Sequence, residues 1–250
     1  MSAPDDLTPT ELAELIRPHL TTGLIAFDVD GVLAPLVAHA DAARLSPDVH
    51  ELLSRLATLA TVGIVSGRAV ESLERLFAFP AELHVFGSHG LEERGAPAAP
   101  LDDDERYTFD QLEIIATRGA DAAGDGAWLE YKPASVVLHT READDARAAP
   151  AVQAVTNLGR MIDGAQVTPG SGVVELLARS ASKGDALRAL AQREGCDPIV
   201  FLGDDVTDED AFAVMGDDDV SVRVGPGDSR ARYRLADPTA VVELLGALVG

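Results

Sequence analysis

The sequence predicts an α/β protein: a doubly wound, mostly parallel sheet with a smaller α+β domain inserted into it. Three observations lead to this prediction. Short apolar runs of strand length alternate with helical patterns towards both ends of the chain. These runs end in aspartate, serine or glycine, as strands do where ligands bind to open α/β sheets. A middle block instead alternates apolar and charged residues, which indicates a sheet with one polar face.

The first part of the chain predicts three strands separated by helices. Thr8-Pro9-Thr10-Glu11 begins a short helix, because Thr8 can cap it and Glu11 lies near the positive end of the dipole. Further helices are expected at 46–59 and 69–77, with 34–43 as a loop over the first strand's end. The strands are expected in the apolar runs 24–27, 60–65 and 83–86.

The first of these strands runs directly into two aspartates, Asp28 and Asp30, and Gly31 lets the chain turn sharply behind them. Burying two carboxylates is costly unless a cation or hydrogen-bond donors lie beside them. Ligands of open α/β sheets bind at the carboxyl ends of the strands, where this pair lies. The alternative is that the strand simply ends in a solvated Asp-x-Asp-Gly turn. The residues at the ends of the other strands, described next, argue against this alternative.

Two more strand ends carry residues that could bind ions, one of them an anion and the other a cation. The second strand ends at Ser66-Gly67-Arg68, where a hydroxyl and the free amides of a helix start can donate to phosphate. A later strand, 198–202, leads into five acids within the seven residues 204–210. At the end of a buried strand such a run forms a metal site or a very costly loop. Lys183 opposes the dipole at the start of a helix, a weak sign that it is used elsewhere.

A change of composition near Leu101 predicts the inserted domain. Pro97, Pro100 and the acidic run 102–105 indicate a boundary. We expect a core in two parts, 1–101 and 178–250, and an α+β cap domain at 102–177. The expected elements of the cap are helices 107–120 and 147–162, strands 128–132 and 135–141, and two strands around Val167 and Val173. The core then closes with a strand at 220–225 and a helix at 240–249.

The cap strands alternate, since Leu129 and Tyr131 lie between charged neighbours. One face can therefore pack on helices while the other presents charge. The alternative is an ordinary solvated sheet face with a salt bridge. The residues expected on the polar face are Glu130, Lys132, His139, Arg141 and Glu175.

Composition argues against several classes of partner. The net charge is -22, from 42 acidic and 20 basic residues, which disfavours nucleic acid and anionic membranes. The single cysteine, Cys196, cannot form an intramolecular disulfide. No apolar run reaches membrane-spanning length, and the N-terminus lacks a signal-peptide pattern. We therefore expect a cytoplasmic, monomeric protein.

The strand ends together predict magnesium-dependent phosphoryl transfer. Asp28 would attack phosphorus and form an aspartyl-phosphate. Asp30 would protonate the leaving alkoxide and then deprotonate the hydrolytic water. Mg²⁺, bound by Asp28, Asp30 and Asp204, would share the phosphoryl charge with the protein's own donors. The expected phosphate-binding residues are Ser66, Gly67 and Lys183.

Four motifs in this order resemble those of the haloacid dehalogenase superfamily of phosphatases. The resemblance covers nearly the whole chain and implies that family's core fold, with an α/β cap between the second and third motifs. The matching residues are Asp28-Val29-Asp30-Gly31-Val32-Leu33, Ser66, Lys183, and Gly203-Asp204-Asp205 with Asp208.

A narrower resemblance is to trehalose-6-phosphate phosphatases, and it implies hydrolysis of trehalose 6-phosphate to trehalose and phosphate. It implies that the cap residues Glu130, Lys132 and Glu175 hold hydroxyls of the distal sugar. Arg68 and His89 would line the core side of the site. Asp205 and Asp208 would support the acidic loop. The matching segments are Ser66-Gly67-Arg68, Gly87-Ser88-His89-Gly90, Glu130-Tyr131-Lys132, His139-Thr140-Arg141, Glu175, 203–212, 224–227 and 231–234.

The chain departs from that family at two places. In the first motif, Val29 stands where the family usually has Phe or Tyr, and Val32 stands where it usually has Thr. After Glu175, Leu177-Ala178 stands where the family usually has an Arg-Pro pair. Another phosphorylated disaccharide or pseudo-disaccharide therefore stays open as substrate, and a sugar phosphomutase stays open as activity. A phosphate-sensing domain without catalysis is disfavoured, because Asp28, Asp30 and Lys183 are all present.

Overall fold

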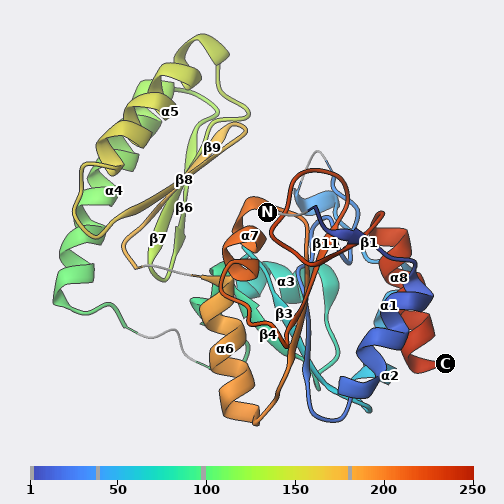
Figure 1. Ribbon diagram of the computed structural model, residues 1–250. Helices are drawn as coiled ribbons and strands as arrows, with labels where there is room; N and C mark the ends of the chain where they lie inside the picture. Colours follow the sequence, from blue (N-terminus) through green and yellow to red (C-terminus); the bar gives the residue numbers. More distant parts are fainter. Residues whose placement is uncertain (1–2, 38–39, 97–99, 180–181) are drawn as a thin grey trace. The chain divides into compact units, whose positions relative to one another are not determined.

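The computed structural model describes residues 3–37, 40–96, 100–179 and 182–250 (Figure 1). The chain divides into two compact units. One comprises Met1–Pro97 and Ala181–Gly250, and the other Ala98–Ser180. The larger unit is therefore built from both ends of the sequence, with the smaller one inserted. Pro97 and residues 38–39 of the expected loop lie outside the described residues.

The larger unit contains an eight-stranded sheet in the order β1-β12-β11-β10-β2-β3-β4-β5. All neighbouring pairs are parallel except β4 and β5. The strands are β1 (Asp5–Asp6), β2 (Leu24–Phe27), β3 (Thr61–Val65), β4 (His84–Gly87), β5 (Glu92–Glu93), β10 (Ile199–Gly203), β11 (Val220–Val224) and β12 (Tyr233–Leu235). The central strand β2 thus pairs with β3, close in sequence, and with β10, from beyond the insertion.

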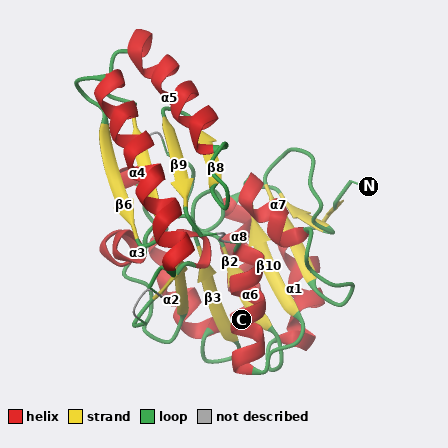
Figure 2. Cartoon of the chain, turned by 90° about the vertical axis from the view of Figure 1, so that its left-hand side faces the viewer, coloured by secondary structure: helices red, strands yellow, loops and turns green. Residues whose placement is uncertain are grey.

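Helices cover both faces of this sheet (Figures 1 and 2). Ile25 and Phe27 of β2 face the cluster formed with α1, α2, α3 and α8, whereas Leu24 and Ala26 face α6 and α7. This strand is fully buried on both faces, as its continuous apolar run predicts. The helices are α1 (Pro9–Ile16), α2 (Pro47–Leu56), α3 (Val70–Phe77), α6 (Lys183–Glu194), α7 (Val206–Phe212) and α8 (Pro238–Val249), with short 3₁₀ turns at Arg17–His19, Ala40–Ala42 and Ser88–Gly90.

The smaller unit is a four-stranded antiparallel sheet with two helices on one face (Figure 2). Its elements are α4 (Asp103–Ala123), β6 (Trp128–Lys132), β7 (Ser135–His139), α5 (Asp145–Gly159), β8 (Gln166–Gly170) and β9 (Val173–Leu177), with sheet order β6-β7-β9-β8. Val136, Leu138 and Leu176 pack with the helices. The alternate residues form the other sheet face, which no described helix of this unit covers.

The predicted fold class is confirmed, with three corrections of detail. The first cap helix begins at Asp103 rather than at 107, because Asp102 caps it and the acidic run forms its first turn. The run of acids after β10 is not a loop throughout, because α7 begins at Val206. The short strands β1, β5 and β12 were not predicted, since each has only two or three residues. None of the helices in the described part of the chain combines the length and apolar character needed to cross a membrane.

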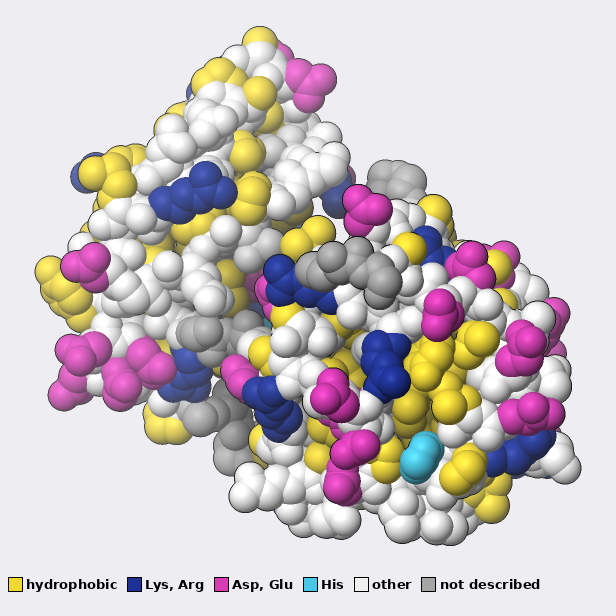
Figure 3. Space-filling view, in the orientation of Figure 1, with side chains coloured by type: hydrophobic (Ala, Val, Ile, Leu, Met, Phe, Trp, Pro, Cys, Tyr) yellow, Lys and Arg dark blue, Asp and Glu magenta, His cyan; other side chains and the backbone are white. Residues whose placement is uncertain are grey.

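Acidic side chains are spread over the visible face of both units and do not form one patch (Figure 3). Lysine and arginine side chains lie among them on the same face.

Candidate active site

The candidate site lies where β2 ends, between its neighbours β3 and β10. The backbone N–H of Asp28 donates to Leu202 O at 2.9 Å, so the pairing with β10 continues through this residue. Asp28 is 4% exposed. Because the strands are parallel, the residues after β2, β3, β4 and β10 emerge at one edge of the sheet.

Asp28, Lys183 and Asp208 form a buried ion network. Lys183 Nζ donates to Asp28 Oδ2 and to Asp208 Oδ1, each at 2.8 Å, and lies 3.9 Å from Asp205 Oδ1. The second oxygen of Asp28 accepts a hydrogen bond from Val29 N at 2.6 Å. The Lys183 side chain is only 1% exposed. Three carboxylates thus share one ammonium group.

This surplus of negative charge affects the protonation of the network. Burial raises the pKa of Asp28 well above its usual range, although Lys183 acts in the opposite direction. Burial likewise raises the pKa of Asp208. For Lys183, burial opposes the charge, but the carboxylates of Asp28 and Asp208 outweigh it and raise the pKa of the ammonium. Lys183 therefore stays protonated, and a further cation nearby would relieve the excess negative charge.

The start of α7 holds the acidic residues in place. Asp205 Oδ1 accepts hydrogen bonds from the backbone N–H groups of Thr207 and Asp208, at 2.8 and 3.0 Å. Asp208 Oδ2 in turn accepts from Asp204 N and Asp205 N, at 2.8 and 3.0 Å. This is a capping box made of two aspartates. Gly203 is required beside it, because a Cβ there would lie 2.3 Å from Asp208 Cγ.

Asp30 is held by an arginine from the end of β3. Arg68 Nε and Nη2 donate to the two carboxylate oxygens of Asp30, each at 2.6 Å. The guanidinium carbon lies 5.5 Å from the ring centre of Phe77. The hydrogen bond from Arg68 to Asp30 also raises the pKa of the guanidinium. A paired contact of this kind fixes the plane of the Asp30 carboxylate.

The loops after β3 and β4 bring Ser66, Gly67 and His89 together. Ser66, which is 1% exposed, accepts a hydrogen bond from Arg68 N at its Oγ, at 3.2 Å. Its carbonyl accepts from His89 N at 2.9 Å. A Cβ at Gly67 would lie 2.7 Å from His89 Cε1, so the imidazole packs directly on this glycine. Four of the predicted core residues, counting Arg68, therefore lie side by side.

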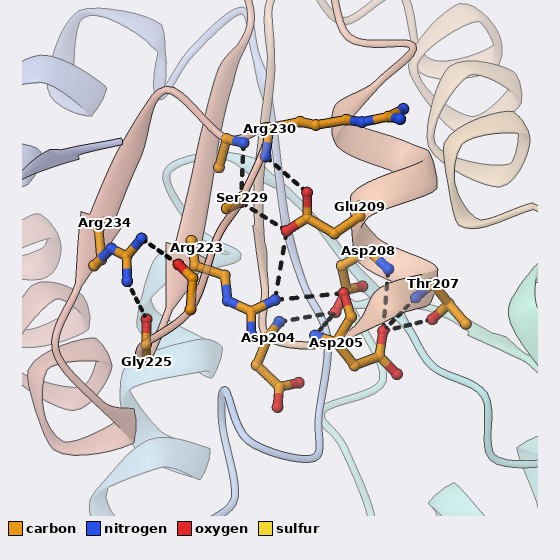
Figure 4. A network of polar contacts seen from close by, with 12 residues as sticks. Asp204, Asp205, Thr207, Asp208, Glu209, Arg223, Gly225, Ser229, Arg230 and Arg234 are labelled. Carbon is orange, nitrogen blue, oxygen red and sulfur yellow. Dashed lines mark hydrogen bonds and ion pairs between the residues drawn. The ribbon is translucent and has the colours of Figure 1, made fainter. Parts of the chain in front are cut away.

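Asp204 follows β10 directly, so it offers a further carboxylate at the edge of the sheet where Asp28 lies. Its carboxylate approaches the turn after Asp30, since a Cβ at Gly31 would lie 2.1 Å from Asp204 Oδ2. Among the described residues this carboxylate has no hydrogen-bond or ion-pair partner, and it points away from the other labelled side chains (Figure 4). Burial raises the pKa of Asp204 to about 7, with further effects from Asp208 and Asp205. A partly buried carboxylate whose oxygens have no described partner suits a hard divalent cation.

A different acidic group, Asp28, Asp205 and Asp208, has ligand atoms within 4.8 Å of one another. These are the same three carboxylates that surround Lys183 Nζ. An ammonium already supplies the positive charge among them. Asp204 is not part of this group, and Asp205 and Asp208 hold the start of α7 in place.

A polar network behind the acidic loop was missed in the sequence (Figure 4). Arg223 Nη1 lies 3.4 Å from Glu209 Oε1 and 3.5 Å from Asp205 O. Glu209 also accepts hydrogen bonds from Ser229 Oγ and Arg230 N, at 2.6 and 2.7 Å. The network joins the start of α7 to β11 and the following loop. The available signal was an arginine within the mostly apolar strand β11.

The predicted sugar-binding residues lie in the smaller unit, on the sheet face without helices. Lys132 Nζ and Ser135 Oγ donate to Glu175 Oε1, at 3.1 and 2.7 Å. Glu130 Oε2 lies 2.9 Å from His139 Nε2, and this hydrogen bond lowers the pKa of Glu130. The face thus presents two hydrogen-bonded groups, one around Glu175 and one formed by Glu130 and His139, rather than isolated solvated side chains.

The departure at Leu177-Ala178 has a structural counterpart. Ala178 N donates to Ala134 O at 2.8 Å, a hydrogen bond that a proline in this position could not form. Leu177 is 3% exposed. Arg141 lies beyond the end of β7, where its Nε donates to Ser171 O at 3.0 Å.

Comparison with known proteins gives consistent relatives. A family model described as trehalose-phosphatase matches residues 26–239. The trehalose-phosphate phosphatase of Mycobacterium marinum is 31% identical over 96% of this chain and 65% of its own length. The trehalose-6-phosphate phosphatase of Escherichia coli is 34% identical over 84% of this chain and 80% of its own. The chain therefore spans slightly less than two thirds of the mycobacterial relative.

Solved structures show the same fold. The C-terminal domain of trehalose-6-phosphate phosphatase from Candida albicans matches with a TM-score of 0.74 and 22% identity. The match covers 98% of this chain and 99% of that one. Both units of the chain are thus present in this relative.

Proposed function

This chain belongs to the trehalose-phosphatase family, whose model matches residues 26–239, and we propose that it hydrolyses trehalose 6-phosphate to trehalose and inorganic phosphate. The observation that carries the proposal is the buried carboxylate of Asp28, held by Lys183 at the end of the central strand. Asp30 follows two residues later, within reach of the same strand end.

In the first step, an Asp28 oxygen attacks phosphorus, and the bond from phosphorus to the sugar's 6-oxygen breaks. Asp30 pairs with Arg68 through both of its oxygens, so it must first leave this pair and take up a proton from solvent. It then gives that proton to the departing oxygen, and trehalose is released. In the second step, Asp30 takes a proton from water, which attacks phosphorus and releases Asp28 and phosphate. Lys183, Ser66 and the amides of the following turn balance the charge of the phosphoryl oxygens.

We propose Mg²⁺ as the cofactor, held by Asp28 and Asp204 together with the backbone at Asp30. The ion would supply positive charge to the phosphoryl oxygens and offset the acidic residues around it. The fit rests on the open carboxylate of Asp204 beside Gly31.

Chelation is expected to silence the enzyme. After dialysis against EDTA, phosphate release from trehalose 6-phosphate should fall at least about a hundredfold, because Asp28 and Asp204 then repel the anionic substrate. Added Mg²⁺ should restore it, and a coupled phosphate assay measures both. Full activity after exhaustive chelation would contradict the metal assignment.

A screen of sugar phosphates with and without Mg²⁺ tests the activity itself. Release of inorganic phosphate distinguishes a phosphatase from a phosphomutase, which returns the group to a sugar. A higher kcat/KM for trehalose 6-phosphate than for glucose 6-phosphate supports the disaccharide. Equal kcat/KM values for the two compounds would contradict the assignment of a disaccharide substrate. A higher kcat/KM for another disaccharide phosphate would identify that compound as the better substrate.

We propose that the smaller unit selects the sugar, through Glu130, Lys132 and Glu175. The core residues Asp28, Ser66 and Lys183 would contact only the phosphoryl group, which all sugar phosphates share. A neutral polyol is bound most strongly by charged groups that make several hydrogen bonds, and a site built for hydroxyls rejects analogues without them.

Glu130→Ala should lower kcat/KM for trehalose 6-phosphate by roughly ten- to a hundredfold, because it removes one charge-assisted hydrogen bond to the substrate in the transition state. It should reduce hydrolysis of 4-nitrophenyl phosphate far less, because that substrate has no sugar. Glu142→Ala, a change of an exposed acid in the same unit, is the control. An equal loss for both substrates would make Glu130 a folding residue.

A further inference from the structure

The smaller unit carries an exposed tryptophan that the proposed chemistry does not yet use. Trp128 is the first residue of β6, and strand alternation places it on the same sheet face as Glu130 and Lys132. It is 51% exposed and is not part of the unit's apolar core. A large aromatic side chain left in solvent is unusual for packing and common at recognition sites.

The orientation of Trp128 is fixed by its neighbours. Its ring stacks on that of His139, the residue of β7 that pairs with Trp128 of β6. The ring centres are 3.9 Å apart and the planes are inclined by 5°. His139 Nε2 is in turn hydrogen-bonded to Glu130 Oε2 at 2.9 Å. The indole plane is therefore fixed parallel to the imidazole of His139, which is itself hydrogen-bonded to Glu130. Side chains fixed in this way lose little entropy when a ligand binds.

The face has the two kinds of group that a sugar ring requires. A pyranose carries hydroxyls around its edge and C–H groups on its faces. Glu130, Lys132 and Glu175 offer charged partners for the hydroxyls. Contacts within the face hold them in place, since Lys132 is hydrogen-bonded to Glu175 and Glu130 to His139. A rigid aromatic plane offers apolar area for the C–H face. Binding sites for small molecules combine apolar surface and a few polar groups in this manner.

We propose that Trp128 is a specificity-determining residue that stacks on a sugar ring of the substrate, an inference that rests on the proposed disaccharide phosphatase activity. The indole covers the C–H face of the ring, while the charged residues of the same sheet face hold its hydroxyls. Selectivity for a disaccharide over a monosaccharide phosphate then depends partly on this side chain.

The sequence offers a direct probe, because Trp128 is the only tryptophan of the chain. Tryptophan emission therefore reports this position alone. Trehalose, which has no phosphate, should change the emission saturably, with a midpoint equal to its inhibition constant in the phosphatase assay. Inhibition by trehalose with unchanged emission would overturn the proposal.

Kinetics supply the second test. Trp128→Ala should lower the ratio of kcat/KM for trehalose 6-phosphate to that for 4-nitrophenyl phosphate by about tenfold. Trp128→Phe, which keeps an aromatic plane, should recover part of the loss. Tyr131→Ala is the matched control, since Tyr131 lies on the same strand, is 54% exposed and points to the opposite face. A loss for both substrates alike, or one equalled by Tyr131→Ala, would make Trp128 a structural residue.

The two proposals can fail separately. If no phosphate is released from trehalose 6-phosphate, the proposed substrate is wrong. A panel of neutral mono- and disaccharides then tests Trp128 alone. A saturable emission change with one of them would support the stacking role, and no response to any sugar would overturn it.

Discussion

Asp28→Asn should abolish turnover of trehalose 6-phosphate, lowering kcat by at least about a thousandfold. An amide at this position keeps the size and the contact with Val29 N, but it cannot attack phosphorus or form the aspartyl-phosphate. Rapid-quench assays with wild-type and variant enzyme, both saturated with Mg²⁺, measure the loss. Turnover within tenfold of wild type would end the assignment of Asp28 as nucleophile.

The same substitution should leave the fold intact. In the protein without metal, Asp28, Asp205 and Asp208 share one ammonium, so removal of a buried negative charge relieves repulsion. The amide NH2 then faces Lys183 Nζ, a donor against a donor, which offsets this gain. The thermal midpoint of the variant in EDTA is therefore expected close to that of the wild type. A clear fall in Tm would mean that the loss of activity reports misfolding.

Lys183→Met should destabilise the larger unit by about 3–5 kcal/mol. Methionine preserves much of the buried stem but removes the ammonium, which leaves Asp28 and Asp208 buried without their cation. Urea unfolding followed by circular dichroism measures the change. Catalysis should also be lost, because the same ammonium faces the attacking carboxylate.

Two comparisons make this prediction specific. Arg193 also contacts two carboxylates, Glu93 and Glu194, but its side chain is 46% exposed, so Arg193→Met should cost less than about 1 kcal/mol. Adding Asp208→Asn to Lys183→Met should recover part of the lost stability, since it removes one of the unpaired charges. Equal effects of the buried and the exposed substitutions would contradict the assigned role of burial.

The larger elements of the fold were predictable because their signals are local. The run Leu24–Phe27 is uniformly apolar, and Thr8 caps α1 as expected. The strand Trp128–Lys132 has the predicted bounds. β12 was not predictable, because it has only three residues and nothing in the sequences of β1 and β11 indicates that a strand lies between them. The start of α7 was missed because a run of acids resembles a solvated loop, although Asp205 and Asp208 are a capping pair.

The candidate site was predictable in composition but not in its pairings. The positions of Asp28, Ser66 and Lys183 at strand and helix ends follow from the order of the elements. That Arg68 contacts Asp30 does not, because side chains 38 residues apart meet only through the geometry of neighbouring strands. Arg223 was missed for the same reason. The resemblance to the family is confirmed by the family model, whose match spans all of these motifs.

The division of the larger unit between the two ends of the chain has a consequence during synthesis. Strand β2 and its partner β3 leave the ribosome early, but β10 and Lys183 follow only after the inserted unit. Lys183 lies 155 residues after Asp28, which corresponds to roughly 8–30 s of translation. During that interval β2 has an unpaired edge, and Asp28 lacks its ammonium partner. The nascent chain must keep this half-sheet soluble until the C-terminal segment arrives, so the interval is the stage at which chaperones would matter most.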